Sequence, residues 1–355
     1  MDLNNIKGVG PEKSKKLMNA GYSTVESIAF SSSRDLSMDS GIPEETARQI
    51  IASAKIILRS KENTKGGKLV EILSGKDAKK ILNSMEHITT GLKGLDKILG
   101  GGVETCAVTE FYGPAKAGKT QICHQLCVTV QLPKEKGGLE APAIYIDTER
   151  TVKYDHIKSI AERFGLDPDL ASDNVFYAYA MNSEALFDMV HKSLDEVVQN
   201  RGIKLVIVDC LTGHFRAEYC GRESLPARQQ KINRVIHDLL RIAVSHDLAV
   251  VVTNQVHSQP DLYGKSENPI GGHTVAHGVT FRLGLSTRKH NMRIATVVDA
   301  PALPPDETYF AITSKGLIDI TAKNLSSKEP IEFSDGKEIE EKEDEKVEEE
   351  EAVTD

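Results

Sequence analysis

Apolar runs of five to seven residues alternate with longer amphipathic runs through the middle of the chain. The apolar runs, which predict β-strands, cover residues 106–112, 143–147, 203–209 and 248–254. The amphipathic runs predict helices near residues 120–131, 153–165, 183–199 and 228–246. Strands without a polar face must be covered on both faces, which is typical of a parallel sheet between helices. The pattern therefore predicts an α/β fold built on a mainly parallel sheet.

The residues on either side of this alternation predict further parts. Shorter β-type runs near residues 279–286, 293–298 and 307–313 favour an antiparallel extension of the sheet. Residues 1–58 are typical of a small all-helical domain, and residues 59–87 form a polar, lysine-rich connector suited to a hinge. We therefore expect a helical domain, a linker, and an α/β domain over residues 88–324.

The remaining residues, 325–355, form an acidic tail that changes how the net charge is interpreted. Residues 337–355 hold eleven acidic side chains against three lysines, which accounts for the whole formal charge of −8. The rest of the chain is neutral and can carry basic patches, so the acidic total does not exclude nucleic acid. The tail has almost nothing to bury and is predicted to be disordered.

Composition is that of a globular protein. Hydrophobic residues make up 39% of the chain and charged residues 27%. No apolar run is long enough to cross a bilayer, and the first residues lack a signal pattern, so we expect no membrane partner. The five cysteines have no metal-ligand spacing, which indicates free thiols in the reducing cytoplasm.

The stretch Gly113-Pro-Ala-Lys-Ala-Gly-Lys-Thr120 fits the phosphate-loop pattern. It follows a β-type run and precedes a helical one. The glycines would let backbone N–H groups point at an anion, and the N-terminus of the helix would add its partial positive charge. Lys119 would reach the β- and γ-phosphates of ATP, and Thr120 would offer its hydroxyl to Mg²⁺. The predicted nucleotide-binding residues of this stretch are Gly113, Pro114, Ala115, Lys116, Ala117, Gly118, Lys119, Thr120 and Gln121.

Three later strand ends carry side chains suited to the same chemistry. Asp209 follows an apolar run and would hold Mg²⁺. Glu149 is a candidate general base for the attacking water, with a solvated loop acid as the alternative. Gln255 can hydrogen-bond a γ-phosphate and transmit its loss to the following segment. Ligands of open α/β sheets gather at the carboxyl ends of the strands, so we expect these residues to meet there.

The N-terminal residues contain two short glycine turns between predicted helices. The first is Ile6-Lys-Gly-Val-Gly-Pro11, and a weaker copy is Ser40-Gly-Ile-Pro43. Such a turn presents backbone N–H groups to a phosphodiester oxygen and reads no bases. The first copy resembles a helix-hairpin-helix motif, which makes Gly8 and Gly10 candidate DNA contacts. The alternative is a packing unit that does not touch DNA.

Six separated runs resemble those of the archaeal RadA recombinases of the RecA superfamily, in the same order. They begin at Leu99, Gly118, His214, Thr253, Pro269 and Asp299 and read LGGGVET, GKTQICHQ, HFRAEY, TNQV, PIGGH and DAPALP. The resemblance covers nearly the whole chain except the acidic tail. It implies a RecA-like P-loop ATPase core that uses ATP and Mg²⁺, preceded by a small all-α helix-hairpin-helix domain.

The resemblance also implies roles for individual positions around the nucleotide. Glu149 matches the catalytic glutamate, and Gln255 matches the γ-phosphate sensor. His156 stands where the family places a side chain that stacks on adenine. Further nucleotide-linked positions are His277, which would couple nucleotide state to the subunit interface, and Asp299 and Pro301, which would cap ATP from a neighbouring subunit.

Two DNA-binding loops are implied in the same way. The first, residues 216–228, contains Arg216, Tyr219, Arg222 and Arg228. The second, residues 256–270, contains His257, Gln259, Tyr263 and Lys265. Cations in such loops follow phosphates, and flat side chains wedge between bases.

Three departures from the family pattern bear on function. Lys116 places an extra cation in the phosphate loop, and Glu223 places a negative charge in the first DNA loop. The family polymerises through a phenylalanine ahead of the ATPase core, whereas no Phe lies between Phe30 and Phe111. Ile72 or Ile81 would have to substitute, with less buried apolar area.

These observations leave three candidate functions. The resemblance favours a nucleoid-associated, DNA-dependent ATPase that assembles on single-stranded DNA as a filament or ring and promotes pairing and strand exchange with double-stranded DNA in repair. Its partners would be DNA, further copies of itself and recombination mediators. The departures favour instead a divergent paralogue that acts as an accessory with little strand exchange. A third candidate, a RecA-fold ATPase of another process, is disfavoured by the predicted DNA-binding domain.

Overall fold

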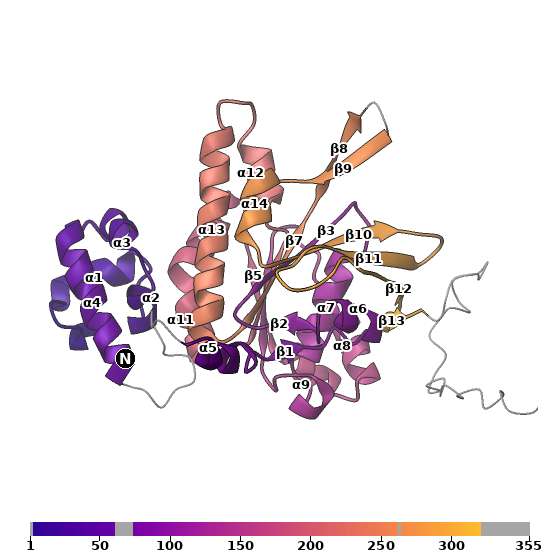
Figure 1. Cartoon of the computed structure of the whole chain (residues 1–355), viewed down its shortest axis with the longest axis horizontal. Helices are drawn as coiled ribbons and strands as arrows, with labels where there is room; N and C mark the ends of the chain where they lie inside the picture. Colours follow the sequence, from indigo (N-terminus) through magenta and orange to yellow (C-terminus); the bar gives the residue numbers. More distant parts are fainter. Residues whose placement is uncertain (1–2, 61–73, 262–263, 321–355) are drawn as a thin grey trace, which may run out of the picture.

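The computed structural model describes residues 3–60, 74–261 and 264–320, and it places a helical domain beside a domain built on a large sheet (Figure 1). The acidic tail, Ile72 of the connector and Tyr263 of the second DNA loop lie outside the described residues, as do the side chains of Ile81, Gln259 and Lys265. Within the described ranges, no helix is both long enough and apolar enough to span a bilayer.

Residues 3–60 form the N-terminal domain, which is all helical as the pattern predicts. Its elements are η1 Leu3–Asn5, α1 Pro11–Asn19, α2 Val25–Ala29, α3 Ser33–Ser40 and α4 Glu44–Ser60. Proline stands in the first turn of α1, and the Thr24 side chain caps α2 by accepting from the Ser27 backbone N–H. Buried side chains such as Leu17, Ile28 and Ile50 give this domain its own core.

The larger domain is built on one sheet with strand order β13-β12-β11-β10-β3-β7-β6-β4-β5. Neighbouring strands from β10 to β5 are parallel, and those from β10 to β13 are antiparallel. The strands are β3 Val108–Tyr112, β4 Ala143–Asp147, β5 Val175–Tyr179, β6 Leu205–Asp209, β7 Ala249–Asn254, β10 Phe281–Thr287, β11 Met292–Asp299, β12 Glu307–Thr313 and β13 Gly316–Asp319. The mainly parallel sheet and its antiparallel extension are therefore confirmed.

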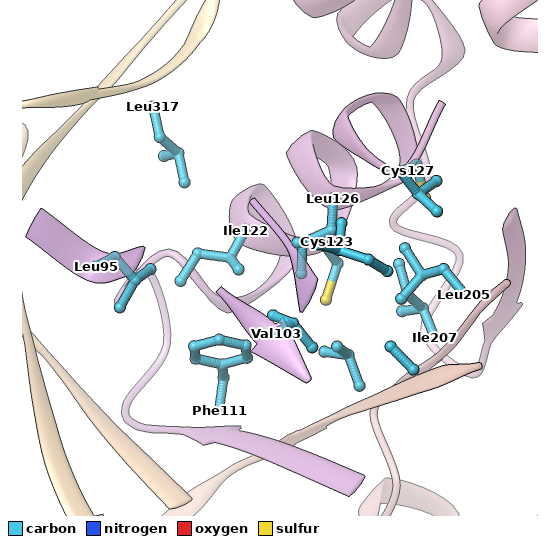
Figure 2. Close-up of a cluster of buried hydrophobic side chains, with 14 of the residues drawn as sticks. Leu95, Val103, Phe111, Ile122, Cys123, Leu126, Cys127, Leu205, Ile207 and Leu317 are labelled. Atoms are coloured by element: carbon cyan, nitrogen blue, oxygen red, sulfur yellow. The ribbon is translucent and has the colours of Figure 1, made fainter. Parts of the chain in front are cut away.

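Helices cover both faces of this sheet (Figure 1). One face carries α6 Lys93–Ile98, α7 Lys119–Thr129, α8 Tyr154–Arg163 and α9 Pro168–Asp173; the other carries α10 Ser183–Asp188, η3 Met189–Ser193, α11 Leu194–Arg201, α12 Gly213–Glu218, α13 Leu225–His246 and α14 Gly272–Gly278. Alternate residues of β6 feed two separate cores, because Leu205 and Ile207 join one and Val206 and Val208 the other. Figure 2 shows the first core, in which Ile122 of α7 lies near Phe111 of β3 and Leu126 lies beside Cys123.

Short elements complete the described chain. They are α5 Gly75–Leu82, the pair β1 His87–Ile88 and β2 Val103–Glu104, the turn η2 Lys134–Lys136, and the antiparallel hairpin of β8 Val256–Asp261 and β9 Gly264–Pro269. Helix α5 lies within residues 59–87, so the described end of the expected hinge is helical. The hairpin coincides with the second predicted DNA loop.

The sheet domain contains several elements that the pattern did not predict, and two of the differences are informative. Strand β5 was not predicted, although Val175–Tyr179 is as long as β4 and wholly apolar or aromatic. In the sheet it is an edge strand in which only Val175 is buried. The single helix expected over 183–199 is interrupted by η3, a π-helical turn. A π turn shifts the helix register locally, which hydrophobic periodicity does not reveal.

The N-terminal domain docks on the sheet domain through charged and polar side chains at η3 and α13. Arg234 of α13 contacts Asp35 at 3.0 Å and Asp39 at 2.7 Å. His191 of η3 lies between Asp39 at 3.2 Å and Asp238 at 2.8 Å, and the Tyr22 hydroxyl donates to Asp39 at 2.7 Å. The π turn thus places His191 at the domain boundary, where it bridges carboxylates from both sides.

Gly21 allows this close approach. Its φ of +88° suits glycine, and a Cβ there would lie 2.6 Å from the carbonyl oxygen of His191. Any larger residue would push the two domains apart at this point.

Docking of the two domains is expected to weaken at high pH. Burial lowers the pKa of His191, but hydrogen bonds and charge from Asp238 and Asp39 outweigh it and raise that pKa to about 9. Since the pKa in the folded state lies above the ordinary value of 6.5, this contribution is fully present below pH 6.5 and is lost as pH rises through 9. Asp238 stays beside His191 in the sheet domain, so only the part of the shift that comes from Asp39 bears on docking. We expect a loss on the order of 1 kcal/mol in docking free energy.

Small-angle scattering and amide exchange between pH 6 and 10 check this expectation. The wild type should expand over that range. His191→Gln should already be expanded at pH 6 and change little further. Lys192→Ala is the matched control, because Lys192 pairs with Asp188 within the same domain. An identical pH response in wild type and His191→Gln would contradict the role of His191.

Candidate nucleotide site

The phosphate loop joins β3 to α7 at the carboxyl edge of the sheet. A Cβ at Gly113 would lie 2.2 Å from the carbonyl oxygen of Leu285 on β10, so the close strand contact at this point requires glycine. Gly118 is the N-cap of α7, and no side chain caps that helix start. Backbone N–H groups at the start of α7 are therefore left for an anion, and the helix dipole favours negative charge there.

Lys119 is held at the mouth of this loop. Its ammonium group donates to the carbonyl oxygens of Gly113 at 2.8 Å and Pro114 at 2.9 Å. Burial lowers the pKa of Lys119, while Asp209 and Glu149 oppose that shift. Because a lysine has three donors, one N–H remains for a phosphate oxygen.

Asp209 accepts hydrogen bonds from several hydroxyl groups. Its Oδ2 accepts from Thr120 at 2.7 Å and from Tyr145 at 2.5 Å, and its Oδ1 accepts from Thr253. Tyr145 is fully buried in β4, and burial, reinforced by nearby Cys123 and Asp209, raises its pKa well above the ordinary value. Sequence reasoning missed Tyr145 and Thr253; the available signal was a hydroxyl inside an otherwise apolar strand, which requires a partner.

The same residues suit a magnesium ion. Mg²⁺ prefers oxygen ligands and is commonly held by one or two protein groups together with substrate phosphates. The Thr120 hydroxyl and the Asp209 carboxylate, 2.7 Å apart, provide such a pair beside the phosphate loop. Among the described residues, no group of three or more His, Cys, Asp and Glu side chains offers a different metal site.

Glu149 lies at the next strand end, as predicted. Its Oε1 accepts from Gln255 Nε2 at 2.6 Å and from the Cys210 thiol at 3.4 Å. The Asp147 carboxylate holds the loop in place by accepting from the backbone N–H groups of Glu149 at 2.9 Å and Thr151 at 2.8 Å. The structure thus brings the predicted base and the predicted sensor into direct contact.

A histidine flanks the start of α7. His156 Nε2 lies 2.6 Å from Gln121 Oε1, and burial lowers the pKa of His156. The ring of His156 lies 5.7 Å from that of buried His124, which sequence reasoning did not single out. These two imidazoles come from α7 and α8. The resemblance assigns stacking on the adenine ring of ATP to His156.

Comparison with known proteins identifies the family. A sequence model described as Rad51 matches residues 82–320. The chain belongs to the Rad51 family. A second model, described as a SAM-like helix-hairpin-helix tandem, matches residues 1–55. The predicted fold class, a RecA-like core after a helix-hairpin-helix domain, is therefore confirmed.

Two curated relatives carry the same name, "DNA repair and recombination protein RadA". The chain is 45% identical over 319 residues to the one from Aeropyrum pernix, which covers 90% of this chain and 97% of the relative. It is 45% identical over 318 residues to the one from Metallosphaera sedula, which covers 89% of this chain and 95% of the relative. The expected resemblance to archaeal RadA is confirmed over almost the whole length of both relatives.

Three positions implied for the Rad51-family nucleotide site lie apart from the phosphate loop of the same chain. His277 is exposed on α14, where its ring stacks on His273 at 5.7 Å. Asp299 and Pro301 are exposed at the end of β11. Across the described ranges, no hydrogen bond or ion pair links these three residues to Lys119, Thr120 or Asp209.

The two predicted DNA loops lie at one end of the domain (Figure 1). Arg216 of α12 and Arg222 of the α12–α13 connection are exposed. Tyr219 packs partly buried against Phe215, with the Lys231 ammonium 5.5 Å from its ring, and Arg228 is half-buried. His257 of β8 is half-buried, and Gly8 and Gly10 are exposed before α1.

Proposed function

We propose that this Rad51-family chain is an ATP-dependent DNA recombinase that assembles on single-stranded DNA and promotes homologous pairing and strand exchange. The observation that carries the proposal is the position of Gln255. Its side chain donates to Glu149 at 2.6 Å, and its backbone leads directly into the β8–β9 hairpin. One residue therefore joins the predicted hydrolytic base to a predicted DNA loop. The names of the curated relatives support the same function.

The proposed reaction is hydrolysis of the γ-phosphate of ATP. Water attacks the γ-phosphorus, the bond to the bridging oxygen of ADP breaks, and the proton of the water passes to the Glu149 carboxylate. Lys119 and the N–H groups at the start of α7 stabilise charge on the phosphate oxygens. Mg²⁺, when bound by Thr120 and Asp209, supplies further charge neutralisation. Gln255 would change partners when the γ-phosphate leaves.

The proposed assembly is head to tail. The phosphate loop follows Tyr112, which pairs with Gly284 of β10. Asp299, at the end of antiparallel β11, pairs with Arg282, so the chain after it leads away from the carboxyl edge of the sheet, where the phosphate loop lies. A Cβ on Gly100 would lie 3.2 Å from Leu303, so the segment after Asp299 passes beside the turn between α6 and β2. Asp299 and Pro301 therefore suit contact with the nucleotide of a second copy, in a heterologous interface.

Electron microscopy of the purified full-length chain with single-stranded DNA tests the proposal. With Mg²⁺ and a non-hydrolysable ATP analogue, we expect the protein to coat the DNA; with ADP, coating should be sparse. Bare DNA under both conditions would overturn the proposal.

A second candidate, the accessory paralogue, is favoured by the exposed charges of Lys116 and Glu223. Glu223 stands beside Arg222 in the first loop, where like charge opposes phosphate. A strand-exchange assay separates the two functions. Joint molecules formed by this protein alone favour the recombinase, whereas DNA coating without joint molecules favours the accessory.

A further inference from the structure

We infer that Asn254 is a positioning residue that clamps the roots of both predicted DNA loops to the phosphate-loop strand. The inference rests on the proposed function, because it names how the same nucleotide site would act on those loops. Asn254 is the last residue of β7 and is fully buried.

The side-chain amide of Asn254 contacts three separate elements. Its Nδ2 donates to Glu110 Oε1 of β3 at 2.8 Å and to the carbonyl oxygen of Ile270 at 2.7 Å. Its Oδ1 accepts from the Thr212 hydroxyl at 2.6 Å. Both N–H donors of the amide are therefore used, and the geometry assigns the amide one orientation.

Two of these contacts stand at the roots of the predicted DNA loops. Ile270 follows β9 and closes the hairpin, because its N–H also donates to the carbonyl oxygen of Gln255 at 2.9 Å. Thr212 immediately precedes α12, where the first loop begins. Asn254, which directly precedes the sensor Gln255, thus holds both roots together.

The third contact anchors the clamp to the phosphate-loop strand. Glu110 is fully buried, and Arg282 of β10 donates to its Oε2 at 2.6 Å. The Arg282 guanidinium lies 5.3 Å from the ring of Tyr112, the residue before Gly113. A paired, buried carboxylate is a rigid acceptor, because separating it from its partner would leave charge out of contact with water.

As a consequence, Asn254 is held in place while the neighbouring Gln255 can change its contacts. Gln255 can exchange its contact with Glu149 for one with a phosphate, while Asn254 keeps the preceding backbone in place. A movement of Gln255 then displaces the β8–β9 hairpin, because the end of β7 cannot move with it. Removal of the clamp would let the roots shift independently, so nucleotide state would no longer set DNA affinity.

Single-stranded DNA affinity, measured with an ATP analogue and with ADP, tests the inference. In the wild type we expect the ratio of the two affinities to be about 30-fold. Asn254→Ala should reduce it to about threefold while the affinity for nucleotide changes little. The reason is that Asn254 contacts the phosphate loop only through its backbone carbonyl, which accepts from the Gly113 N–H at 3.3 Å and is kept in the variant. Thr212→Val, which removes one hydroxyl at constant volume, should give an intermediate ratio, and Thr212→Ser should restore the wild-type ratio.

Thr109→Val is the matched control. Thr109 is the residue before Glu110, is equally buried, and its hydroxyl has no hydrogen-bond partner within the described ranges. This variant should keep the wild-type ratio. If Asn254→Ala does not fold, the comparison of Thr212→Val with Thr212→Ser decides.

The outcomes separate this inference from the proposed function. A wild type whose DNA affinity ignores nucleotide would overturn both. A wild type with a strong ratio that Asn254→Ala and Thr212→Val retain would overturn only the clamp.

Discussion

Lys119→Ala is expected to abolish nucleotide-dependent DNA binding and to reduce ATP hydrolysis by about 10²–10³-fold. The reason is that a fixed cationic donor at the transferring phosphate is lost, and such donors typically contribute that much. The two carbonyl oxygens that Lys119 now contacts, those of Gly113 and Pro114, can turn to water, so we expect the fold to survive. Nucleotide affinity by calorimetry and phosphate release check the result.

Lys116→Gly, which removes the other cation of the phosphate loop, is the comparison for this variant. Lys116 belongs to the same loop, is exposed, and has a φ of +67°, a conformation that glycine adopts without strain. Its loss should leave ATP affinity within a few-fold of the wild type. If Lys119→Ala still assembled on DNA in response to ATP, the proposed use of the phosphate loop would be wrong.

Glu149→Gln is expected to slow hydrolysis by about 10²–10⁴-fold, the usual contribution of a positioned general base. The amide has the same shape, and its oxygen can still accept from Gln255, which now contacts Glu149 at 2.6 Å. ATP binding should therefore persist, and assemblies on DNA should outlast those of the wild type. Phosphate release and the lifetime of the complexes by microscopy measure the two effects separately.

The exposed Glu135 provides a control. Glu135→Gln changes the net charge by the same amount, but Glu135 lies in η2 and not at the carboxyl ends of the strands. Wild-type turnover by Glu149→Gln would exclude Glu149 as the base and leave the role of activating water to another group.

The elements that the sequence predicts best are those marked by a distinct run of apolar residues. The strands that end at Asp147, Asp209 and Asn254 are fully buried, so their apolar runs stand out from the surroundings. Their shared edge follows from parallel pairing, which brought Thr120, Asp209, Glu149 and Gln255 together as expected. By contrast, β5 is an edge strand, and the π turn at Met189–Ser193 leaves the apolar pattern of its helix unchanged.

The contacts that sequence reasoning missed depend on register between distant strands. Glu110 and Asn254 are 144 positions apart, and Tyr145 and Asp209 are 64 apart. The residue types show that each buried polar group needs a partner, but not which partner it meets. The docking of the N-terminal domain on Arg234 and His191 could not be predicted for a different reason. Charged side chains on a helix usually indicate a solvent-exposed surface and not a domain contact.

The antiparallel course of β11 has a further consequence for stoichiometry. In the proposed assembly, every ATP is enclosed by two copies that contribute different faces. An open row of subunits then has one fewer enclosed ATP than it has members, and the subunit at one terminus holds its ATP without a lid. A closed circle has no such terminus, so counting tightly held nucleotides per protomer would distinguish the two shapes without any image.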